Sequence, residues 1–245
     1  MLELPIWNSS QKMTIAPSKI IALGLNYLDH IKESENIALK LAISADRAKN
    51  EIPTEPLLFP KTPNVLIGPD EAIILPKIAY TYDFSEVRTD IEAELALIIR
   101  DRCRNVSQEE TFKHILGYTA MNDISQRNIQ KSDKCGWFRG KSFDTFGPIG
   151  PLVVLHEDLL TLGDPQNLWI ESRINGKLKQ HSNTKHMIFS IPEIIAFVSR
   201  NFTLEAGDII LTGTPQGVSP IQPGDSVEVE IEHIGILRNS VEMEQ

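Results

Sequence analysis

The segment from Asp90 to Ile99 places the strongest constraint on the fold, because it combines a strand-like hydrophobic pattern with two carboxylates two residues apart. Alternate residues of a strand face the same side, so Glu92 and Glu94 are expected on one face and the odd-numbered residues from Ile91 to Ile99 on the other. Glutamate is depleted in strands and costly to bury without a partner. The pair therefore requires a cation or a solvent-exposed face, and an edge strand with one wet face is the simpler interpretation of this segment alone.

The composition is that of an ordinary globular protein. The chain has 245 residues, of which 41% are hydrophobic and 23% charged, enough for one large domain or two small ones. A formal net charge of -9 disfavours nucleic-acid binding, and a small acidic substrate would need lysine, arginine or a metal at its site. The two cysteines, Cys103 and Cys135, have no metal-ligand spacing and suit a reducing compartment. We find neither a leader-like amino terminus nor about eighteen consecutive apolar residues, so we expect a cytoplasmic protein.

Most of the chain reads as short strands separated by turns. Residues 20–24 form an apolar run that is too short for a helix, and Asn175-Gly176 predicts a hairpin turn. Ser190 is expected to cap one helix, and Ser107 another that extends to about Leu116 and is ended by Gly117. Many short strands with few helices indicate an α+β, β-rich single domain.

A helical pattern after Asn26 spaces His30 and Glu33 three residues apart, so their side chains are expected to be neighbours. Such pairs are common on wet helix surfaces. A carboxylate that holds one imidazole nitrogen also leaves the other nitrogen basic and oriented, as in a general base that acts on water. Residues 34–55 are expected to form a mobile helical connector that could serve as a lid or hinge.

A third acid follows the next strand-like run. Asp123 is expected to open a helix on which Arg127 and Gln130 share a face. Together with Glu92 and Glu94 it makes an all-oxygen carboxylate set, which suits Mg²⁺ or Mn²⁺, allows Ca²⁺ and does not suit zinc. The six histidines include no i,i+4 pair, so a histidine-based metal site has little support.

Two turns could also carry chemistry. Residues 136–142 imitate a phosphate-binding loop, but three residues rather than four separate the glycines and no strand precedes them, so we reject nucleotide binding. Lys141 in this turn is either a functional cation or a solvated lysine. Residues 209–218 predict a strand that enters a turn of hydroxyls and glycines, which is either a plain hairpin loop or a source of backbone N–H groups for a carboxylate.

Six short motifs occur in a fixed order along the chain. They are Gly24-Leu25-Asn26-Tyr27 with His30 and Glu33, Glu92-x-Glu94-Leu95, Gly117-Tyr118 with Asn122-Asp123, Arg127-x-x-Gln130, Gly140-Lys141-Ser142-Phe143-Asp144, and Thr212-Gly213-Thr214-Pro215-x-Gly217-Val218. The ordered set resembles the fumarylacetoacetate hydrolase superfamily, from about Ile20 to the carboxyl terminus, and most closely its short acylpyruvase-like and oxaloacetate decarboxylase-like members. The resemblance implies a mixed β-roll of the type found in the C-terminal domain of this family, and a homodimer.

The resemblance also implies a role for each of these site residues. The ligands of Mg²⁺ or Mn²⁺, with Ca²⁺ as a further candidate, would be Glu92, Glu94 and Asp123. The catalytic residues would be Lys141 and the water-activating pair of His30 and Glu33. The substrate contacts would be Arg127, Gln130 and Thr214. Leu25 departs from close relatives, which often have a polar residue there, frequently arginine.

The implied reaction cleaves the C–C bond of a 3-acylpyruvate, a small diketo acid, to pyruvate and a carboxylate, through an activated water and a metal-bound enolate. Oxaloacetate decarboxylation and keto–enol tautomerisation or isomerisation are alternatives, because they share that enolate. A non-catalytic binding protein on the same scaffold is a third alternative. The chain is expected to divide into residues 1–55, which hold short strands and the connector and form no independent domain, and a catalytic domain of residues 56–245.

Overall fold

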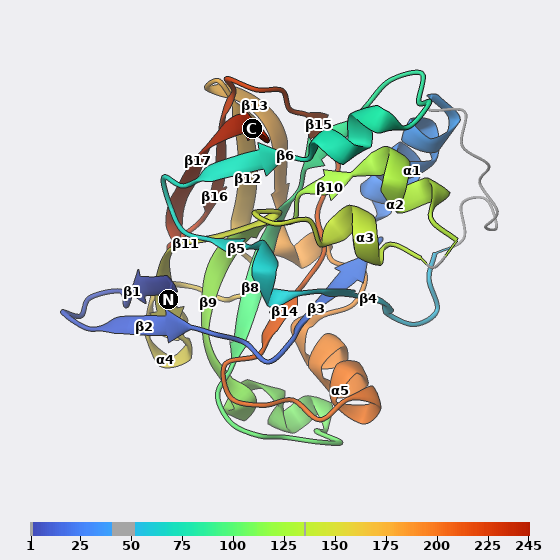
Figure 1. Ribbon diagram of the computed structural model, residues 1–245. Helices are drawn as coiled ribbons and strands as arrows, with labels where there is room; N and C mark the ends of the chain where they lie inside the picture. Colours follow the sequence, from blue (N-terminus) through green and yellow to red (C-terminus); the bar gives the residue numbers. More distant parts are fainter. Residues whose placement is uncertain (1, 41–51, 135) are drawn as a thin grey trace.

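The computed structural model describes residues 2–40, 52–134 and 136–245, without the side chains of residues 35–40. Its centre is a seven-stranded mixed sheet (Figure 1). In sheet order, the strands are β4 (Leu57–Lys61), β3 (Ile20–Gly24), β14 (Ile209–Leu211), β8 (Ala93–Ile99), β9 (Ile115–Asn122), β11 (Gly147–Leu155) and β5 (Leu66–Ile67). Neighbours run antiparallel except for β3 beside β14 and β5 beside β11. Because β3 lies between β4 and β14, part of the segment before residue 56 belongs to the same sheet as the later strands.

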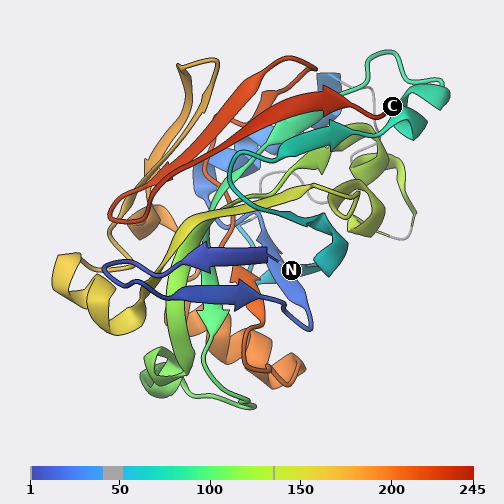
Figure 2. The same cartoon turned by 60° about the vertical axis from the view of Figure 1, so that its left-hand side comes forward.

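A second, five-stranded sheet packs against β8, β9 and β11. Its strands, in sheet order, are β13 (Lys177–Asn183), β12 (Trp169–Ile174), β16 (Ser226–Ile231), β17 (Gly235–Met243) and β6 (Ala72–Leu75). A three-stranded sheet consists of β10 (Ser125–Gln126), β7 (Thr89–Ile91) and β15 (Ser219–Pro220). The amino-terminal hairpin of β1 (Leu2–Pro5) and β2 (Lys12–Ile15) lies beside β11, as Figure 2 shows.

The helices are short and lie at the edges of these sheets. The α-helices are α1 (Leu28–Lys40), α2 (Arg127–Ser132), α3 (Phe138–Lys141), α4 (His156–Leu162) and α5 (Ile191–Asn201), and the 3₁₀ helices are η1 (Pro63–Val65), η2 (Lys77–Thr81), η3 (Gln108–His114) and η4 (Thr184–His186). The predicted α+β, β-rich class is confirmed. None of the helices in the described part of the chain is both long and apolar enough to cross a membrane.

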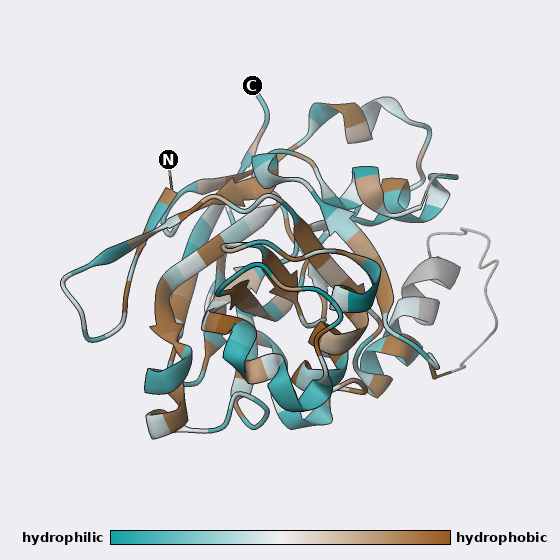
Figure 3. Cartoon of the chain, turned by 90° about the horizontal axis from the view of Figure 1, so that it is seen from below, coloured by the Kyte–Doolittle hydropathy of each residue, from teal (hydrophilic) through white to brown (hydrophobic). Residues whose placement is uncertain are grey.

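Strand β8 is buried on both faces. All seven of its residues are buried, and they alternate between two hydrophobic clusters: Leu95 and Leu97 pack into one, and Ala96 and Ile98 into the other. Seen from below, the central strands are largely brown and the helices at the rim carry most of the teal (Figure 3). The expected edge strand with a wet face is therefore wrong, because β8 lies in the middle of its sheet and is covered from both sides.

The strand pattern changes sheets at Glu92. Ile91 belongs to β7 and packs with the cluster of Ala96 and Ile98, whereas Ala93 begins β8 and packs with the opposite cluster. The prediction that Ile91 and Ala93 share a face is therefore wrong. The chain leaves the three-stranded sheet and enters the seven-stranded sheet at Glu92, so this residue stands at the end of both.

Several turn and cap predictions are confirmed, and two helix predictions are wrong. Ser190 caps α5, and Asn175-Gly176 makes the β12–β13 turn. The helix after Ser107 is the 3₁₀ helix η3, and Gly117 lies inside β9, where a Cβ would come within 2.6 Å of the Val154 carbonyl. Gly117 therefore permits close strand pairing instead of ending a helix. The residues directly after Asp123 likewise pair as β10 with β7, so helix α2 begins only at residue 127.

Candidate active site

The residues predicted for the site converge on one pocket, at the end of the central sheet where α1, α2 and α3 gather (Figure 1). The predicted residues that line it are His30, Glu92, Glu94, Arg127, Gln130, Lys141 and Thr214. The other two, Glu33 and Asp123, hydrogen-bond to His30 and Lys141. The cavity measures about 40 Å³, which is room for a small ion and a few waters.

Strand pairing brings the acidic side chains together. Ala93 pairs with Asn122 across β8 and β9, so Glu92 and Asp123 stand side by side just beyond that pair. The Asp123 N–H donates to the Glu92 carbonyl at 2.9 Å, and the Glu92 N–H donates to the Asn122 side chain at 3.0 Å. Glu94 lies two residues after Glu92 on β8. One oxygen from each of the three buried carboxylates is consequently within 4.8 Å of the other two.

Two buried lysines face this cluster. Lys141 Nζ lies 2.5 Å from both Glu92 Oε2 and Asp123 Oδ2, and Lys61 Nζ lies 2.6 Å from Asp123 Oδ1. Burial alone would lower the pKa of Lys141, but the charges of Asp123 and Glu92 outweigh it and raise that pKa above its ordinary value. Burial lowers the pKa of Lys61 in spite of Asp123. Lys141 is 2% exposed, so the alternative of a solvated lysine is wrong.

Arg127 is held among protein acceptors through each of its nitrogens. It donates to Asp90 at 2.8 Å, to Glu92 at 2.5 Å and to Gln130 at 3.1 Å. Arg88 binds the second oxygen of Asp90 at 2.8 Å. Burial opposes ionisation of Glu92, yet Arg127 and Lys141 outweigh it and hold the pKa of this carboxyl well below its usual range. Asp90 is fully buried and fixes Arg127 against Glu92.

Glu94 differs from the other two acids of the cluster. Its carboxylate accepts the Gly213 N–H at 2.7 Å, and no lysine or arginine of the described residues pairs with it. Burial and the charges of Asp123 and Glu92 raise the pKa of Glu94 well above its usual range. Glu94 is thus the one acid of the cluster that no described lysine or arginine pairs with. Three convergent buried carboxylates, with only oxygen ligands, fit a hard divalent cation such as Mg²⁺ or Mn²⁺.

His30 and Glu33 form the predicted pair. His30 Nδ1 lies 3.1 Å from Glu33 Oε2, and the Gly217 N–H donates to both Glu33 oxygens at 3.0 Å. His30 Nε2 is turned toward the acidic cluster, 3.9 Å from Glu92 Oε1. At position 217, φ is 101° and a Cβ would lie 2.1 Å from the Lys179 carbonyl, so glycine is required there. His30 lines the pocket and is buried, so the alternative of a wet helix surface is wrong.

The turn after β14 supplies backbone N–H groups to carboxylates of the protein itself. Gly213 binds Glu94 and Gly217 binds Glu33, so this turn fixes one residue of the acidic cluster and one of the histidine pair. Thr214 donates to the Ala93 carbonyl at 2.9 Å and accepts from Gln180 at 2.7 Å while lining the pocket. The alternative of a plain hairpin loop is therefore wrong.

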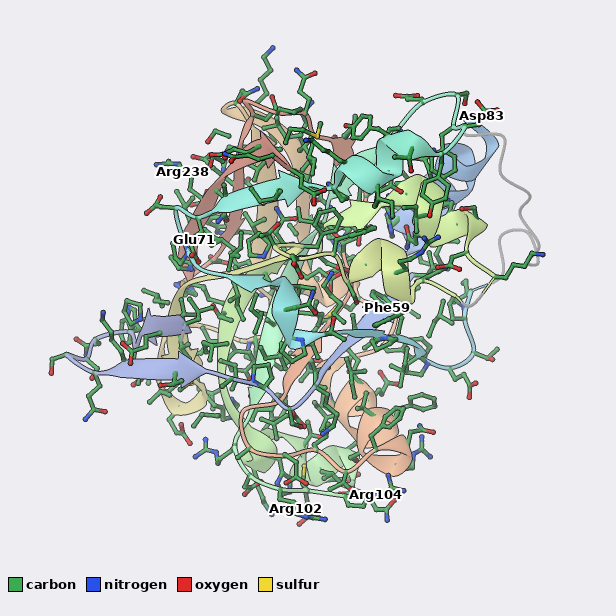
Figure 4. The ribbon with its side chains drawn as sticks, viewed as in Figure 1. Phe59, Glu71, Asp83, Arg102, Arg104 and Arg238 are labelled. Atoms are coloured by element: carbon green, nitrogen blue, oxygen red, sulfur yellow. The ribbon has the colours of Figure 1, made fainter. Side chains whose placement is uncertain are left out.

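The remaining wall of the pocket is mostly apolar, with Leu23, Leu25, Phe59 and Trp137, and it also contains Ser34 and Lys131. The Phe59 ring lies 4.9 Å from Lys141 Nζ and 5.3 Å, edge to face, from the Trp137 ring. Phe59 is labelled in Figure 4, on β4 close to α3. Leu25 has a φ of 59°, unusual for a residue with a side chain, which fixes an aliphatic group at the rim of the site.

Two residues of the site were missed from the sequence. Lys61 ends a short apolar strand, where a lysine is ordinarily solvated, and it meets Asp123 only because β4 joins the central sheet. Asp90 had a usable signal, since it shares the parity of Glu92 and Glu94 in the predicted strand. Of the connector predicted for residues 34–55, residues 34–40 belong to helix α1. Residues 41–51 lie outside the described residues.

Known proteins are similar to this chain over most of its length. The family model described as fumarylacetoacetate (FAA) hydrolase C-terminal matches residues 19–242. The mitochondrial oxaloacetate tautomerase of Rattus norvegicus is 35% identical over 250 residues, which cover 98% of this chain and 72% of that protein. The 2,4-didehydro-3-deoxy-L-rhamnonate hydrolase of a Sphingomonas species is 38% identical over 231 residues, which cover 91% of this chain and 73% of that protein.

A solved structure extends the comparison to the fold. The maleylpyruvate hydrolase of a Sphingobium species, crystallised with manganese(II) and pyruvate, is 30% identical and superposes with a TM-score of 0.74, over 95% of this chain and 73% of that chain. The curled, mixed sheet found here is thus shared with solved members of the family, whose members include hydrolases, a tautomerase and isomerases. The chain belongs to the fumarylacetoacetate hydrolase superfamily.

Proposed function

We propose that this protein is a divalent-metal-dependent hydrolase that cleaves the C–C bond of 3-acylpyruvates to give pyruvate and a carboxylate. The observation that carries the proposal is the orientation of His30. Glu33 holds its Nδ1 side at 3.1 Å and is itself fixed by Gly217, while Nε2 faces the acidic cluster. An imidazole held in this way has one nitrogen free for proton transfer, which is what activation of a water requires.

Glu92, Glu94 and Asp123 would hold Mg²⁺ or Mn²⁺, which supplies Lewis-acid chemistry for the keto-acid end of the substrate. His30 Nε2 takes a proton from water, and the hydroxide oxygen attacks the distal carbonyl carbon. Glu33 stabilises the imidazolium that results. The ammonium group of Lys141 lies in the pocket and is placed to donate a hydrogen bond to the developing oxyanion.

The tetrahedral intermediate then breaks between the former carbonyl carbon and C3 of the pyruvate unit. The bond electrons pass to the pyruvate enolate, and its C3 takes a proton from the His30 imidazolium, which restores the neutral ring. The carboxylic acid product keeps the oxygen of the water. Arg127 acts through Glu92 in this scheme, because its nitrogens already donate to protein acceptors. Substrate contacts by Gln130 and Thr214 are supported by their place in the pocket wall.

Oxaloacetate tautomerisation or decarboxylation is a second candidate. The similarity to the rat oxaloacetate tautomerase, which covers 98% of this chain, favours it. Both reactions pass through the enolate and transfer a proton at C3, but neither includes attack by water. Of the two proposed roles of His30, they therefore need only proton transfer at C3.

A panel of 3-acylpyruvates and oxaloacetate, assayed with Mg²⁺ and with Mn²⁺, tests the proposal. We expect pyruvate and an equimolar carboxylic acid from at least one acylpyruvate. Release of carbon dioxide or loss of the enol form from oxaloacetate alone would establish the second candidate instead. Turnover of no compound, with substrate binding retained, would indicate a non-catalytic binding protein on this scaffold.

A further inference from the structure

A second group of potential metal ligands lies at the opposite end of β8 from the acidic cluster. Asp101, Cys103 and His114 each place one ligand atom within 4.8 Å of the others. Glu94 and Asp101 are separated by seven positions of a mostly extended chain, or roughly 20 Å at about 3.3 Å per residue. In Figure 4 the neighbouring residues Arg102 and Arg104 are labelled at the base of the molecule, far from Phe59 in the pocket wall.

We propose that Asp101, Cys103 and His114 form a binding site for Zn²⁺ or a similar thiophilic divalent metal, separate from the acidic cluster. The donor set carries the first part of the argument. A thiolate, an imidazole and a carboxylate are the ligands that zinc takes in proteins, whereas Mg²⁺ prefers oxygen alone. The two sites of the chain would therefore select different metals.

The backbone around these ligands is fixed before any metal binds. The Arg100 N–H donates to the His114 carbonyl at 2.8 Å, so the exit from β8 is tied to the end of η3. Cys103 and Leu204 exchange two backbone hydrogen bonds of 3.0 Å, which hold the loop against the segment that follows α5. The backbone that carries the ligands is thus already held by hydrogen bonds at both ends. Metal binding would therefore have to order side chains only, which keeps its entropic cost small.

The side chains are arranged so that a metal can enter from the surface. Cys103 is 7% exposed and packs at the edge of a hydrophobic cluster, while Asp101 is exposed and His114 is half-buried. His114 Nδ1 lies 2.6 Å from Asp101 Oδ1. Ligands of a tetrahedral zinc ion are about 3–4 Å apart, so closure requires movements on the order of 1 Å by the two outer side chains.

Neighbouring arginines do not neutralise this site. Arg100 pairs with Glu157 at 2.5 Å and Arg102 with Glu205 at 3.4 Å, whereas the described partner of the Asp101 carboxylate is His114. On binding, the S–H bond of Cys103 breaks, a metal–sulfur bond forms and the proton passes to solvent. The three protein ligands leave the fourth tetrahedral position to a water.

Cobalt(II) is the probe that tests this proposal, because a cobalt–thiolate bond gives a charge-transfer band that carboxylate ligands do not give. Chelator-treated protein is first given excess Mg²⁺ to fill the acidic cluster, and one equivalent of Co²⁺ is then added. We expect the band in the wild-type protein and its loss when Zn²⁺ is added. Absence of the band, or its persistence in Cys103→Ser, would overturn the proposal.

The second cysteine of the chain provides the matched control. Cys135→Ser is expected to keep the band in full, and loss of the band in this variant would contradict the assignment. If Cys103→Ser does not fold, His114→Gln and Asp101→Asn change side chains that are not part of the core. We expect each to weaken Zn²⁺ binding at least 10-fold, measured by equilibrium dialysis, and unchanged binding in both would also overturn the proposal.

Discussion

Glu92 and Glu94 are two residues apart, yet only Glu92 is paired with positively charged side chains. Glu92 contacts Arg127 and Lys141 at 2.5 Å, whereas Glu94 accepts only a backbone N–H among the described residues. Removing one partner of a buried ion pair leaves an uncompensated charge and typically destabilises a protein by about 3–5 kcal/mol. The two glutamates should therefore respond in opposite ways when each is neutralised in the metal-free protein.

In metal-free protein, Glu92→Gln is expected to lower the free energy of unfolding at neutral pH by about 3 kcal/mol, because it strips Arg127 and Lys141 of a shared anion. Glu94→Gln is expected to leave it unchanged or to raise it, because it removes a buried carboxylate that has no cation partner. Urea unfolding of the two variants beside the wild type measures both effects. An equal loss of stability in the two variants would contradict this account of the cluster.

The same contrast predicts a pH dependence. The folded-state pKa of Glu94 lies above its ordinary value of 4.5, so the folded protein binds more protons than the unfolded chain above that pH. The contribution of Glu94 to stability therefore falls as pH rises from about 4.5 toward the raised pKa. The pKa of Glu92 is lowered, so its contribution is present above 4.5 and is lost on acidification.

Unfolding measured between pH 4.5 and 8 without metal separates these contributions. Glu94→Gln should remove a decline in stability with rising pH that the wild type shows. Saturating Mn²⁺ should remove the same decline in the wild type, because a bound cation favours the ionised carboxylate. A wild-type decline that survives in Glu94→Gln would show that another group is responsible.

At the scale of elements, the turn after β14 joins the two halves of the site, since Gly213 holds Glu94 and Gly217 holds Glu33. Gly217→Ala is expected to lower kcat by at least about 10-fold, because the new Cβ would approach the Lys179 carbonyl to 2.1 Å and displace the N–H that fixes Glu33. Steady-state kinetics on the substrate identified by the panel measures this effect.

Gly224→Ala is the matched control for that variant. Gly224 also has a positive φ, of 92°, but a Cβ there would meet nothing within 4 Å. Gly224→Ala should therefore lower the free energy of unfolding by about 1–2 kcal/mol, because alanine is strained in a left-handed backbone, and it should leave kcat unchanged. If the two alanine variants have the same kcat, the turn does not position the histidine pair.

The elements that could be predicted from the sequence are those whose signals are local. The Ser190 cap, the Asn175-Gly176 turn and the spacing of His30 and Glu33 all act within a few residues, and all three are confirmed. Gly117 was misread because its small size serves a close approach to β11, which no local pattern reveals. Tertiary pairing therefore decides where local signals are ambiguous.

The same distinction holds for the site. Glu92, Glu94 and Asp123 were grouped as an all-oxygen carboxylate set that matches motifs of the family, and the structure brings one oxygen of each within 4.8 Å of the others. Lys61 is 62 residues away from Asp123 and reaches it only through the pairing of β4 with β3. Its burial is a property of the assembled sheet, so the sequence pattern contained no sign of it.

At the scale of the whole molecule, η2 and α3 carry large apolar side chains that are exposed. They are Ile78, Tyr80 and Phe138, which are 46%, 50% and 47% exposed, and we call them the apolar patch. Arg139 of α3 donates a hydrogen bond of 2.7 Å to Tyr82, the residue that follows η2. A surface on which such side chains form a contiguous patch is typical of one that another chain covers.

We predict that the protein forms a homodimer through this patch. Light scattering should give a mass of twice 27.5 kDa for the wild type and a shift toward the monomer for Tyr80→Lys, because a buried charge opposes association. Leu178→Lys alters a residue on β13 that is 54% exposed and should leave the dimer intact. Dissociation by Leu178→Lys but not by Tyr80→Lys would place the interface elsewhere.

In the proposed reaction, His30, held by Glu33, activates water beside a metal held by Glu92, Glu94 and Asp123. Its decisive test compares pyruvate release from a 3-acylpyruvate with enolisation of oxaloacetate in His30→Gln, with His181→Gln as an exposed control. We predict that His30→Gln loses at least about 100-fold in hydrolysis, the range of a general base, and a smaller factor in enolisation, which needs no attack by water, while His181→Gln keeps both. Hydrolysis at the wild-type rate in His30→Gln, or equal loss of both reactions, would contradict the account.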